Sequence, residues 1–257
     1  MPLTNRTVLI TGGASGIGLA LATLLVPRRN TVLVTGRDGE RLAAAERALP
    51  GVRGFQSDAS DPEAIRALRE RVLAEFPALD VLVNNAGVMR NIDFGRAAGP
   101  DDVTREIEIN LSGPVRMVEQ FLPHLKGRGE ALIVNVSSGL AFVPFPLAPV
   151  YSATKAGIHA FTQVLRVQLA GTGVTVVELA PPGVETPLFR GEFTEAVKGQ
   201  KAMDPAVLAA RAVAGIEAGR LEIRPGLSNV VKLLSRAAPG FALRQLTRTV
   251  LPKREGA

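Results

Sequence analysis

The sequence predicts an α/β fold: one doubly wound parallel sheet of about seven strands with helices on both faces. Short apolar segments alternate with longer stretches of helical periodicity along most of the 257 residues. This order is typical of parallel strands joined by crossover helices. Several of the apolar segments are continuous rather than alternating with polar residues, as expected of strands that are covered on both faces.

Seven segments are expected to form strands and five to form helices. The strands are 6–11, 31–35, 52–56, 79–85, 131–137, 173–180 and 220–224, and the helices are 16–26, 61–75, 101–122, 151–170 and 204–218. Asp61 and Asp204 each precede a proline, which is a typical helix start. Because no linker divides the chain, residues 1–226 are expected to form one domain and residues 227–257 a helical C-terminal extension of it.

Composition excludes several classes of site. The chain has no cysteine, which rules out disulfides, thiol nucleophiles and thiolate metal sites. His124 and His159 are its only histidines, too few for a histidine-based metal site, so no metal is expected. No signal peptide is visible, and no apolar run reaches the roughly 18 residues that a membrane span needs. These features predict a cytoplasmic protein.

The positive charge is concentrated at the C-terminus. Net charge is +6, and residues 228–257 hold six basic side chains against one acidic side chain, so the rest of the chain is nearly neutral. A basic tail usually forms a solvated helix face or contacts a partner. Nucleic-acid binding is not expected because aromatic residues are not interleaved with the basic ones. Membrane association is disfavoured, because an apolar helix face usually docks on protein.

The first predicted strand runs through "TGGASGIG", residues 11–18, into the first predicted helix. Gly12, Gly16 and Gly18 leave room for a pyrophosphate to approach the backbone, where free N–H groups and the helix dipole favour negative charge. Glycines chosen only for a tight turn are the alternative. The strand before the motif and the helix after it favour dinucleotide binding and a Rossmann-type fold.

The end of the second predicted strand indicates which dinucleotide is bound. Gly36 occupies the position where an acidic residue would bind the ribose hydroxyls of NAD, and Arg37 follows it. An arginine here can meet the 2′-phosphate of NADP, so NADP is favoured. Asp38 keeps NAD possible, although it could instead cap the helix that begins near Glu40.

Tyr151, the only tyrosine of the chain, lies four residues before Lys155, one of six lysines. One helical turn separates them, so both side chains are expected on one helix face. They could belong to an amphipathic helix with a buried tyrosine and a lysine that reaches solvent. Alternatively, the ammonium lowers the pKa of the phenol so that it exchanges protons near neutral pH.

Six motifs resemble those of the short-chain dehydrogenase/reductase family. They are "TGGASGIG" (11–18), "NNAG" (84–87), Asn110 in "EIEINLSGPV", Ser138 in "NVSSG", "YSATK" (151–155) and "PPGVET", which ends at Thr186. They follow the family's order and spacing across residues 6–225. The segments "EIEINLSGPVRM", "NVSSGLAFVP" and "LLSRAAPGFALR" also look like the DltE-like oxidoreductases within that family.

The resemblance implies hydride transfer between a nicotinamide and a carbonyl or alcohol. Tyr151 would be the acid and base, while Lys155 would lower the pKa of Tyr151 and bind the nicotinamide ribose. Ser138 would hydrogen-bond the substrate oxygen, and Asn110 would hold a water that links Lys155 to solvent. The neighbouring Ser137 is expected to be structural. A non-catalytic NADP-binding regulatory protein is the alternative, but it would not need these four residues together.

The resemblance also implies a set of cofactor contacts, a substrate pocket and an assembly. The expected cofactor contacts are Gly12, Ser15, Gly16, Ile17, Gly18, Arg37, Asp58, Asn84, Ala86, Gly87, Tyr151, Lys155, Pro181, Gly183 and Thr186. A mostly apolar pocket is expected from Met89, Leu140, Phe142, Phe145, Leu188 and Phe189, with residues 187–203 as a lid. A homodimer or homotetramer is expected through helices 101–122 and 151–170, the second of which carries Ile158, Phe161, Val164 and Leu165.

Overall fold

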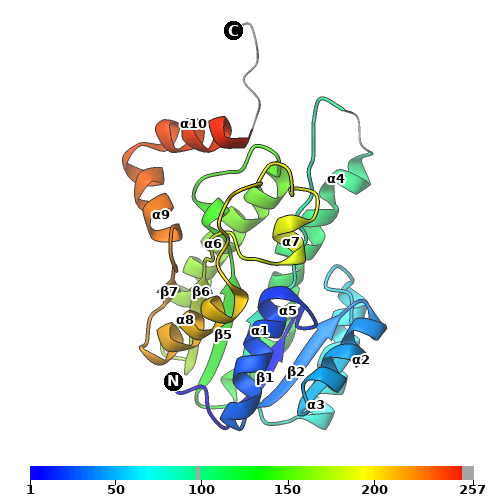
Figure 1. Ribbon diagram of the computed structural model, residues 1–257. Coiled ribbons are helices and arrows are strands. Elements are labelled where there is room, and N and C mark those ends of the chain that lie inside the picture. The colour runs from blue at the N-terminus through cyan, green and yellow to red at the C-terminus, as the bar shows by residue number, and fades with distance from the viewer. Residues whose placement is uncertain (97–98, 251–257) are drawn as a thin grey trace, which may run out of the picture.

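The structure, a computed structural model, describes residues 1–96 and 99–250. Its centre is a seven-stranded parallel sheet in the order β3-β2-β1-β4-β5-β6-β7 (Figure 1). The strands are β1 (Thr7–Ile10), β2 (Thr31–Gly36), β3 (Val52–Gln56), β4 (Leu79–Asn84), β5 (Ala131–Val136), β6 (Val174–Leu179) and β7 (Glu222–Ile223). The predicted doubly wound sheet is confirmed. Its order reverses between β1 and β4, the switch point where such folds bind ligands.

The helices lie on both faces of the sheet. They are α1 (Gly16–Leu25), α2 (Gly39–Ala48), α3 (Pro62–Glu75), α4 (Pro100–Ile107), α5 (Gly113–Lys126), α6 (Pro149–Gln168), α7 (Pro187–Arg190), α8 (Pro205–Glu217), α9 (Ser228–Ala237) and α10 (Pro239–Val250). Short turns of 3-10 helix cover Val26–Arg28 (η1) and Gly139–Ala141 (η3), and a π-helical turn covers Glu108–Ser112 (η2). None of the described helices has both the length and the hydropathy needed to cross a bilayer.

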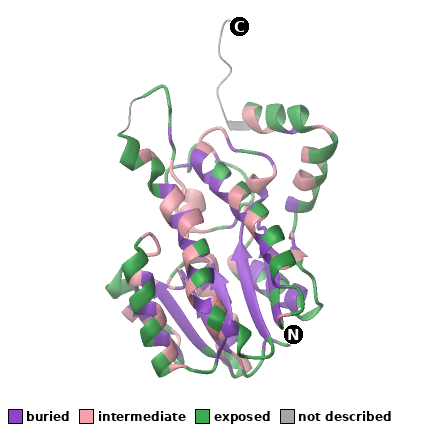
Figure 2. Ribbon diagram, turned by 180° about the vertical axis from the view of Figure 1, so that it is seen from behind, coloured by how far each residue is buried: buried purple, intermediate pink, exposed green. Residues whose placement is uncertain are grey.

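Successive residues of a strand pack into two separate hydrophobic cores, one on each face of the sheet. Val8 and Ile10 pack under α1 and α8, whereas Leu9 between them packs under α3 and α5. The same alternation holds along β4 and β5, so every residue of these strands is buried. Figure 2 shows the buried strands between helices whose outer faces are exposed. This double coverage is why the strand sequences read as continuous apolar runs.

Side-chain caps begin the two helices whose starts the sequence predicted. The Asp61 carboxylate accepts from the Glu63 backbone N–H at 2.8 Å, at the start of α3. The Asp204 carboxylate accepts from the N–H groups of Ala206 and Val207, at the start of α8. Both prolines stand in the first turn, where no intrahelical donor is needed.

The helix predicted over 101–122 is present, but a π-helical turn interrupts its α-helical winding between α4 and α5. Pro114 has no N–H to donate to the carbonyl of Asn110, so the regular hydrogen-bond ladder cannot continue there. The chain widens by one residue instead, and Asn110 lies within the widened turn. Hydrophobic periodicity does not register such a local change of winding.

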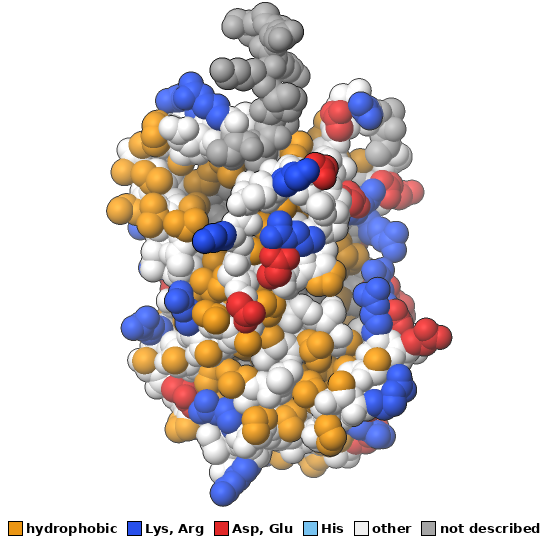
Figure 3. All heavy atoms as spheres, viewed as in Figure 1, with side chains coloured by type: hydrophobic (Ala, Val, Ile, Leu, Met, Phe, Trp, Pro, Cys, Tyr) orange, Lys and Arg blue, Asp and Glu red, His pale blue; other side chains and the backbone are white. Residues whose placement is uncertain are grey.

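The C-terminal helices pack beside η3. Lys232 points inward: its ammonium donates to Glu222 Oε2 at 2.6 Å and lies 5.2 Å from the Phe142 ring centroid. Lys232 therefore contacts the body of the chain and is not part of a solvated basic face. Figure 3 shows apolar side chains gathered on this part of the surface. The exposed large hydrophobic residues of α9, of α10 and of the residue preceding α9 include Leu227, Val230, Leu233, Phe241 and Leu243. Residues 251–257 of the predicted extension lie outside the described residues.

Candidate active site

The glycine-rich turn joins β1 to α1 at the switch point of the sheet. Gly12 and Gly16 have φ angles of +63° and +52°, which favour glycine. A Cβ on Gly18 would lie 2.5 Å from the carbonyl oxygen of Gly12. Ser15 precedes α1 without a side-chain cap, and no acidic residue stands in the first turn. The first-turn N–H groups of α1, including that of Ile17, are thus left available to an anion.

Two residues that the sequence analysis did not single out, Thr11 and Asn85, hold this turn. The Thr11 hydroxyl accepts from the N–H groups of Asn85 and Ala86. The Asn85 side-chain amide donates to the carbonyls of Thr11 and Gly12. Asn84, the predicted contact, instead has a buried side chain that donates to Asn135 Oδ1 on β5 at 2.9 Å. The "NNAG" motif marks this place, but only strand alternation tells which asparagine reaches the turn.

The end of β2 carries the residues expected to select the cofactor. Asp38 caps α2, accepting from the N–H groups of Glu40 and Arg41, so its carboxylate serves the structural role foreseen as its alternative. Arg37 lies close enough to Asp58 for its positive charge to stabilise the ionised Asp58 carboxylate. Burial opposes ionisation of Asp58, but hydrogen bonds from Ser60 and the charges of Arg37 and Arg105 hold its pKa below the usual value.

Ser138, Tyr151 and Lys155 meet above the carboxyl end of β5. Ser138 follows the strand and caps η3, while Tyr151 and Lys155 lie one turn apart at the start of α6. Ser138 hydrogen-bonds the Tyr151 phenol. The Lys155 ammonium donates to the carbonyl of Val136 at 2.8 Å and lies 5.6 Å from the Tyr151 ring centroid.

Burial controls the protonation of both groups. It raises the pKa of Tyr151 to about 12, and the hydrogen bond with Ser138 offsets this only in part. It also lowers the pKa of Lys155 to about 8. The expectation that Lys155 lowers the pKa of the phenol is therefore not met in this structure. The ammonium is directed to the Val136 carbonyl, and desolvation of the phenol outweighs the attraction between the two groups.

Asn110 joins this corner from the π-helical turn. Its side-chain oxygen accepts from Val88 N–H at 2.9 Å, and its amide donates to the Val88 carbonyl and to the Thr154 hydroxyl. A Cβ on Gly87 would lie 3.3 Å from Asn110 Oδ1 and 3.7 Å from Lys155 Nζ. The four predicted catalytic residues thus lie in one buried corner. Because Gly87 has no side chain, the space beside Asn110 and Lys155 stays open.

The loop after β6 borders the same region. Pro181 accepts from Gly139 N–H through its carbonyl, and the Gly183 carbonyl accepts from Met203 N–H. Thr186 caps α7, and its methyl group would lie 3.3 Å from a Cβ on Gly16. Gly16 and Thr186 lie far apart in the chain, and both were predicted to contact the cofactor. They are adjacent here.

An apolar cluster covers the Tyr151 side of the corner. Phe145, Ala148, Tyr151, Phe193 and Val197 form its buried part, with Met89, Leu140, Leu147, Phe189 and Leu246 packed against them. Phe193 and Val197 belong to the predicted lid and are almost fully buried. Phe142 was expected here, but its ring instead packs against His159 at 5.1 Å between ring centroids. Leu188 is also outside the cluster.

Several other polar side chains near the corner bond to partners outside it. Arg90 pairs with Asp102 and Arg190 pairs with Glu185, each at 2.7 Å. Ser137, expected to be structural, donates to the buried Glu178 carboxylate. His159 bonds that same carboxylate at 2.8 Å, while His124 bonds the Leu79 carbonyl. No group of three or more potential metal ligands occurs within residues 1–96 and 99–250.

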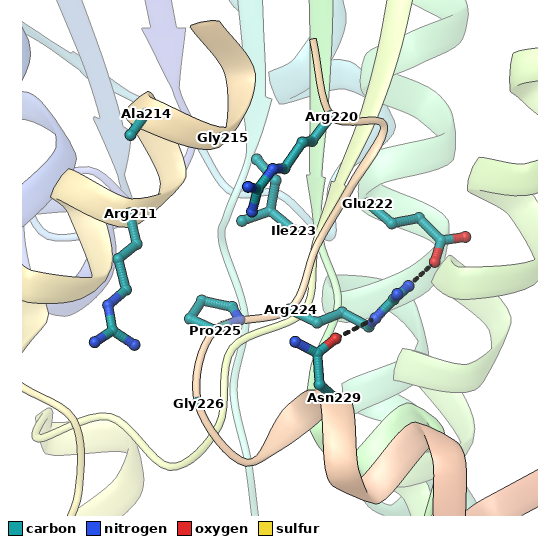
Figure 4. Close-up of a pocket in the computed structure, with 10 residues that line it drawn as sticks. All are labelled: Arg211, Ala214, Gly215, Arg220, Glu222, Ile223, Arg224, Pro225, Gly226 and Asn229. Atoms are coloured by element: carbon teal, nitrogen blue, oxygen red, sulfur yellow. Dashed lines mark hydrogen bonds and ion pairs between the residues drawn. The ribbon is translucent and has the colours of Figure 1, made fainter. Parts of the chain in front are cut away.

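A separate hollow lies away from this corner. It has a volume of about 550 Å³ and opens at the β7 edge, lined by Arg211, Arg220, Arg224 and Asn229 among others (Figure 4). Arg224 is bonded there to Glu222 and Asn229. None of the predicted site residues lines this hollow, so its size is no guide to the chemistry.

Comparison with known proteins identifies the family of the chain. Residues 6–196 match the short chain dehydrogenase family. The chain is 49% identical over 189 residues to the uncharacterized oxidoreductase DltE of Bacillus subtilis, covering 73% of this chain and 75% of that protein.

Two solved short-chain dehydrogenases have the same fold. One, from Burkholderia cenocepacia in complex with NADP, is 24% identical with a TM-score of 0.82 and covers 98% of this chain and 100% of its own. The other, from Sphingobium yanoikuyae in complex with NADPH, is 27% identical with a TM-score of 0.80 and covers 98% of each chain. The fold, the ordered motifs and these matches agree, and the chain belongs to the short-chain dehydrogenase family.

Proposed function

We propose that this protein is an NADP-dependent oxidoreductase that transfers a hydride between the nicotinamide and a carbonyl or alcohol substrate. The observation that carries the proposal is the meeting of Ser138, Tyr151, Lys155 and Asn110 in one buried corner next to the glycine-rich turn. Two similar solved structures are complexes with NADP or NADPH, which supports the choice of cofactor.

The residues present fit such a cofactor. The uncapped start of α1 and the glycines before it suit a pyrophosphate. Arg37 has no bonded partner for its side chain in the described part of the protein and suits a 2′-phosphate, since Asp38 is occupied as a helix cap. Thr186 and Lys155 would hold the nicotinamide end. When bound, the reduced nicotinamide supplies the hydride.

The protonation of Tyr151 suits reduction of a carbonyl. With a pKa of about 12, the phenol carries its proton at neutral pH. Ser138 would hold the carbonyl oxygen, and Tyr151 would donate its proton to that oxygen as the carbonyl carbon receives the hydride. Lys155 and Asn110 would then return a proton to the phenolate from solvent. The reverse reaction needs the phenolate, which the positive charge of the oxidised nicotinamide would favour.

We expect a substrate that is mostly apolar beside its reacting group. The surface next to Tyr151 is made by the apolar cluster around Phe145 and Phe193. Both arginines that could bind an acidic substrate, Arg90 and Arg190, are already paired with carboxylates.

Oxidation of NADPH with a panel of aldehydes and ketones tests the function. Turnover of any apolar carbonyl compound supports the proposal. Tight NADPH binding without turnover across the panel would support the alternative, a regulatory protein that binds NADP without catalysis.

The Arg37→Asp variant should bind NADPH less tightly and NADH better. A charge-assisted hydrogen bond to phosphate contributes about 1.5–3 kcal/mol, so NADPH affinity should fall by a factor of about ten to a hundred. Equilibrium titration with both cofactors measures this. Arg47→Asp, with the same charge change on the exposed last turn of α2, is the control. A wild type that already prefers NADH would contradict this assignment.

The homodimer or homotetramer predicted from the family remains a proposal. Of the apolar residues expected at the interface, Ile158 and Leu165 are buried within the chain itself, whereas Val164 is 58% exposed and its neighbour Val167 is 76% exposed. Light scattering at micromolar concentration should give the mass of a dimer or tetramer. Placing aspartates at Val164 and Val167 should reduce this mass, because the buried interface would then hold unpaired charges. A monomeric wild type would contradict the proposal.

A further inference from the structure

A buried carboxyl group to which the family resemblance assigned no role lies beside the catalytic corner. Glu106, in the last turn of α4, has 0% of its surface exposed. Its Oε2 atom has no hydrogen-bond partner among the described residues. An unsatisfied buried carboxyl group costs more than an apolar side chain of the same shape. The local contacts of Glu106 indicate what it does.

Glu106 and Asn110 contact the same segment of chain. Glu106 Oε1 accepts from Arg90 N–H at 2.8 Å, and Asn110 Oδ1 accepts from Val88 N–H at 2.9 Å. Glu106 and Asn110 are one helical turn apart, and their two partners are two residues apart in the loop after β4. The two side chains therefore hold that loop at successive points along one helix face.

The same two side chains also contact α6. Asn110 donates to Thr154, and the Glu106 carboxyl group interacts with the backbone N–H of Tyr151. Tyr151 lies in the first turn of α6, where backbone N–H groups have no intrahelical acceptor. Ala148, which precedes α6, provides no side-chain cap. Glu106 thus places a carboxyl group from α4 at the N-terminus of the helix that carries the catalytic tyrosine.

The charges around Glu106 leave it able to titrate. Burial raises the pKa of Glu106 to about 7, against the favourable interactions with Arg90 and the Tyr151 N–H. The Arg90 guanidinium is bound by Asp102 of α4, and Glu192, after α7, opposes ionisation further. In turn, the Glu106 charge raises the pKa of the Tyr151 phenol, adding to the effect of burial.

We propose that Glu106 is a positioning residue of the active site, which joins the Arg90 loop to the first turn of α6 and sets the electrostatic environment of the Tyr151 phenol. Its effect on turnover rests on the proposed oxidoreductase function, but its effect on the phenol does not. Ionised Glu106 keeps the phenol protonated and makes it a weaker acid. Proton donation by Tyr151 should therefore slow as the pH rises through the ionisation of Glu106.

The chain allows a direct test because it has one tyrosine and no tryptophan. The ultraviolet absorbance of tyrosinate therefore reports Tyr151 alone. In Glu106→Gln, which keeps a side-chain oxygen for Arg90 N–H, the titration midpoint of the phenol should be lower than in wild type. Glu108→Gln, two residues on and paired with Arg116 at the surface, is the matched control and should leave the midpoint unchanged. Equal midpoints in wild type and Glu106→Gln would overturn the proposal.

The pH profile of kcat gives the second readout. Wild type should lose reductive kcat as the pH rises through about 7, whereas Glu106→Gln should lack this step. Superimposable profiles would contradict the proposal while leaving the enzymatic function intact. If wild type turns over no carbonyl compound, the function fails and the absorbance titration still decides the role of Glu106.

A second variant serves if Glu106→Gln does not fold. Glu106→Asp keeps the charge but shortens the reach to the Arg90 loop, so kcat should fall while the phenol titrates close to its wild-type midpoint. Wild-type kcat in this variant would overturn the positioning role.

Discussion

Replacing Tyr151 by phenylalanine is expected to abolish turnover while leaving NADPH affinity within a few-fold of wild type. The phenyl ring keeps its packing against Phe145 and Phe193, so only the hydroxyl that bonds Ser138 is lost. A positioned general acid contributes about 10²–10⁴-fold in rate. Steady-state NADPH oxidation and an equilibrium NADPH titration measure the two quantities separately.

The paired serines provide a control for this result. Ser138→Ala should also lower kcat, because Ser138 bonds the phenol. Ser137→Ala removes the same atom one residue away, where the hydroxyl serves the buried Glu178, and should affect stability more than kcat. Activity of Tyr151→Phe above about a tenth of wild type would be far from the general-acid range and would refute the role of Tyr151.

Gly18→Ala is expected to remove most NADPH binding and to lower stability. The added Cβ would lie 2.5 Å from the Gly12 carbonyl oxygen and 2.7 Å from Asn85 Nδ2, both held by the hydrogen bonds of the turn. Overpacking of this kind costs about 1–3 kcal/mol. Since it falls on the turn that would receive the pyrophosphate, NADPH affinity should drop by at least about tenfold.

Thermal unfolding and NADPH titration of this variant measure both effects. Gly99→Ala is the control, because a Cβ there meets nothing within 4 Å, and it should behave as wild type. Wild-type NADPH affinity in a folded Gly18→Ala would contradict the phosphate site.

The sheet was predictable because its local signals agree with the tertiary structure. Each inner strand is apolar on both faces, and the capped helix starts at Asp61 and Asp204 are satisfied by their own neighbours. The candidate catalytic residues were also found from sequence, since each lies in a short motif at fixed spacing. For these elements, the residues that determine the structure are close together in the chain.

Other features depend on contacts between distant segments. From the sequence alone, Glu106 resembles a solvated glutamate on a helix surface. It is buried where α4 packs on α6. Lys232 reads as an outward basic residue until Glu222 and Phe142 are placed beneath it. The high pKa of Tyr151 likewise follows from burial by Phe193 and Val197, some forty residues later in the chain. Helical spacing to Lys155 suggested the opposite shift, because spacing carries no information about desolvation.

Transfer of deuterium from labelled cofactor is the most direct measurement of the central claim. Wild-type protein would be incubated with an apolar ketone and with NADPH carrying deuterium at C4 of the nicotinamide, as each of the two epimers in turn. The account predicts that one epimer places deuterium on the carbinol carbon of the product and that the other does not, because a bound ring presents one face to the substrate. Alcohol without deuterium from either epimer, or tight NADPH binding with no alcohol formed from any ketone, would contradict it.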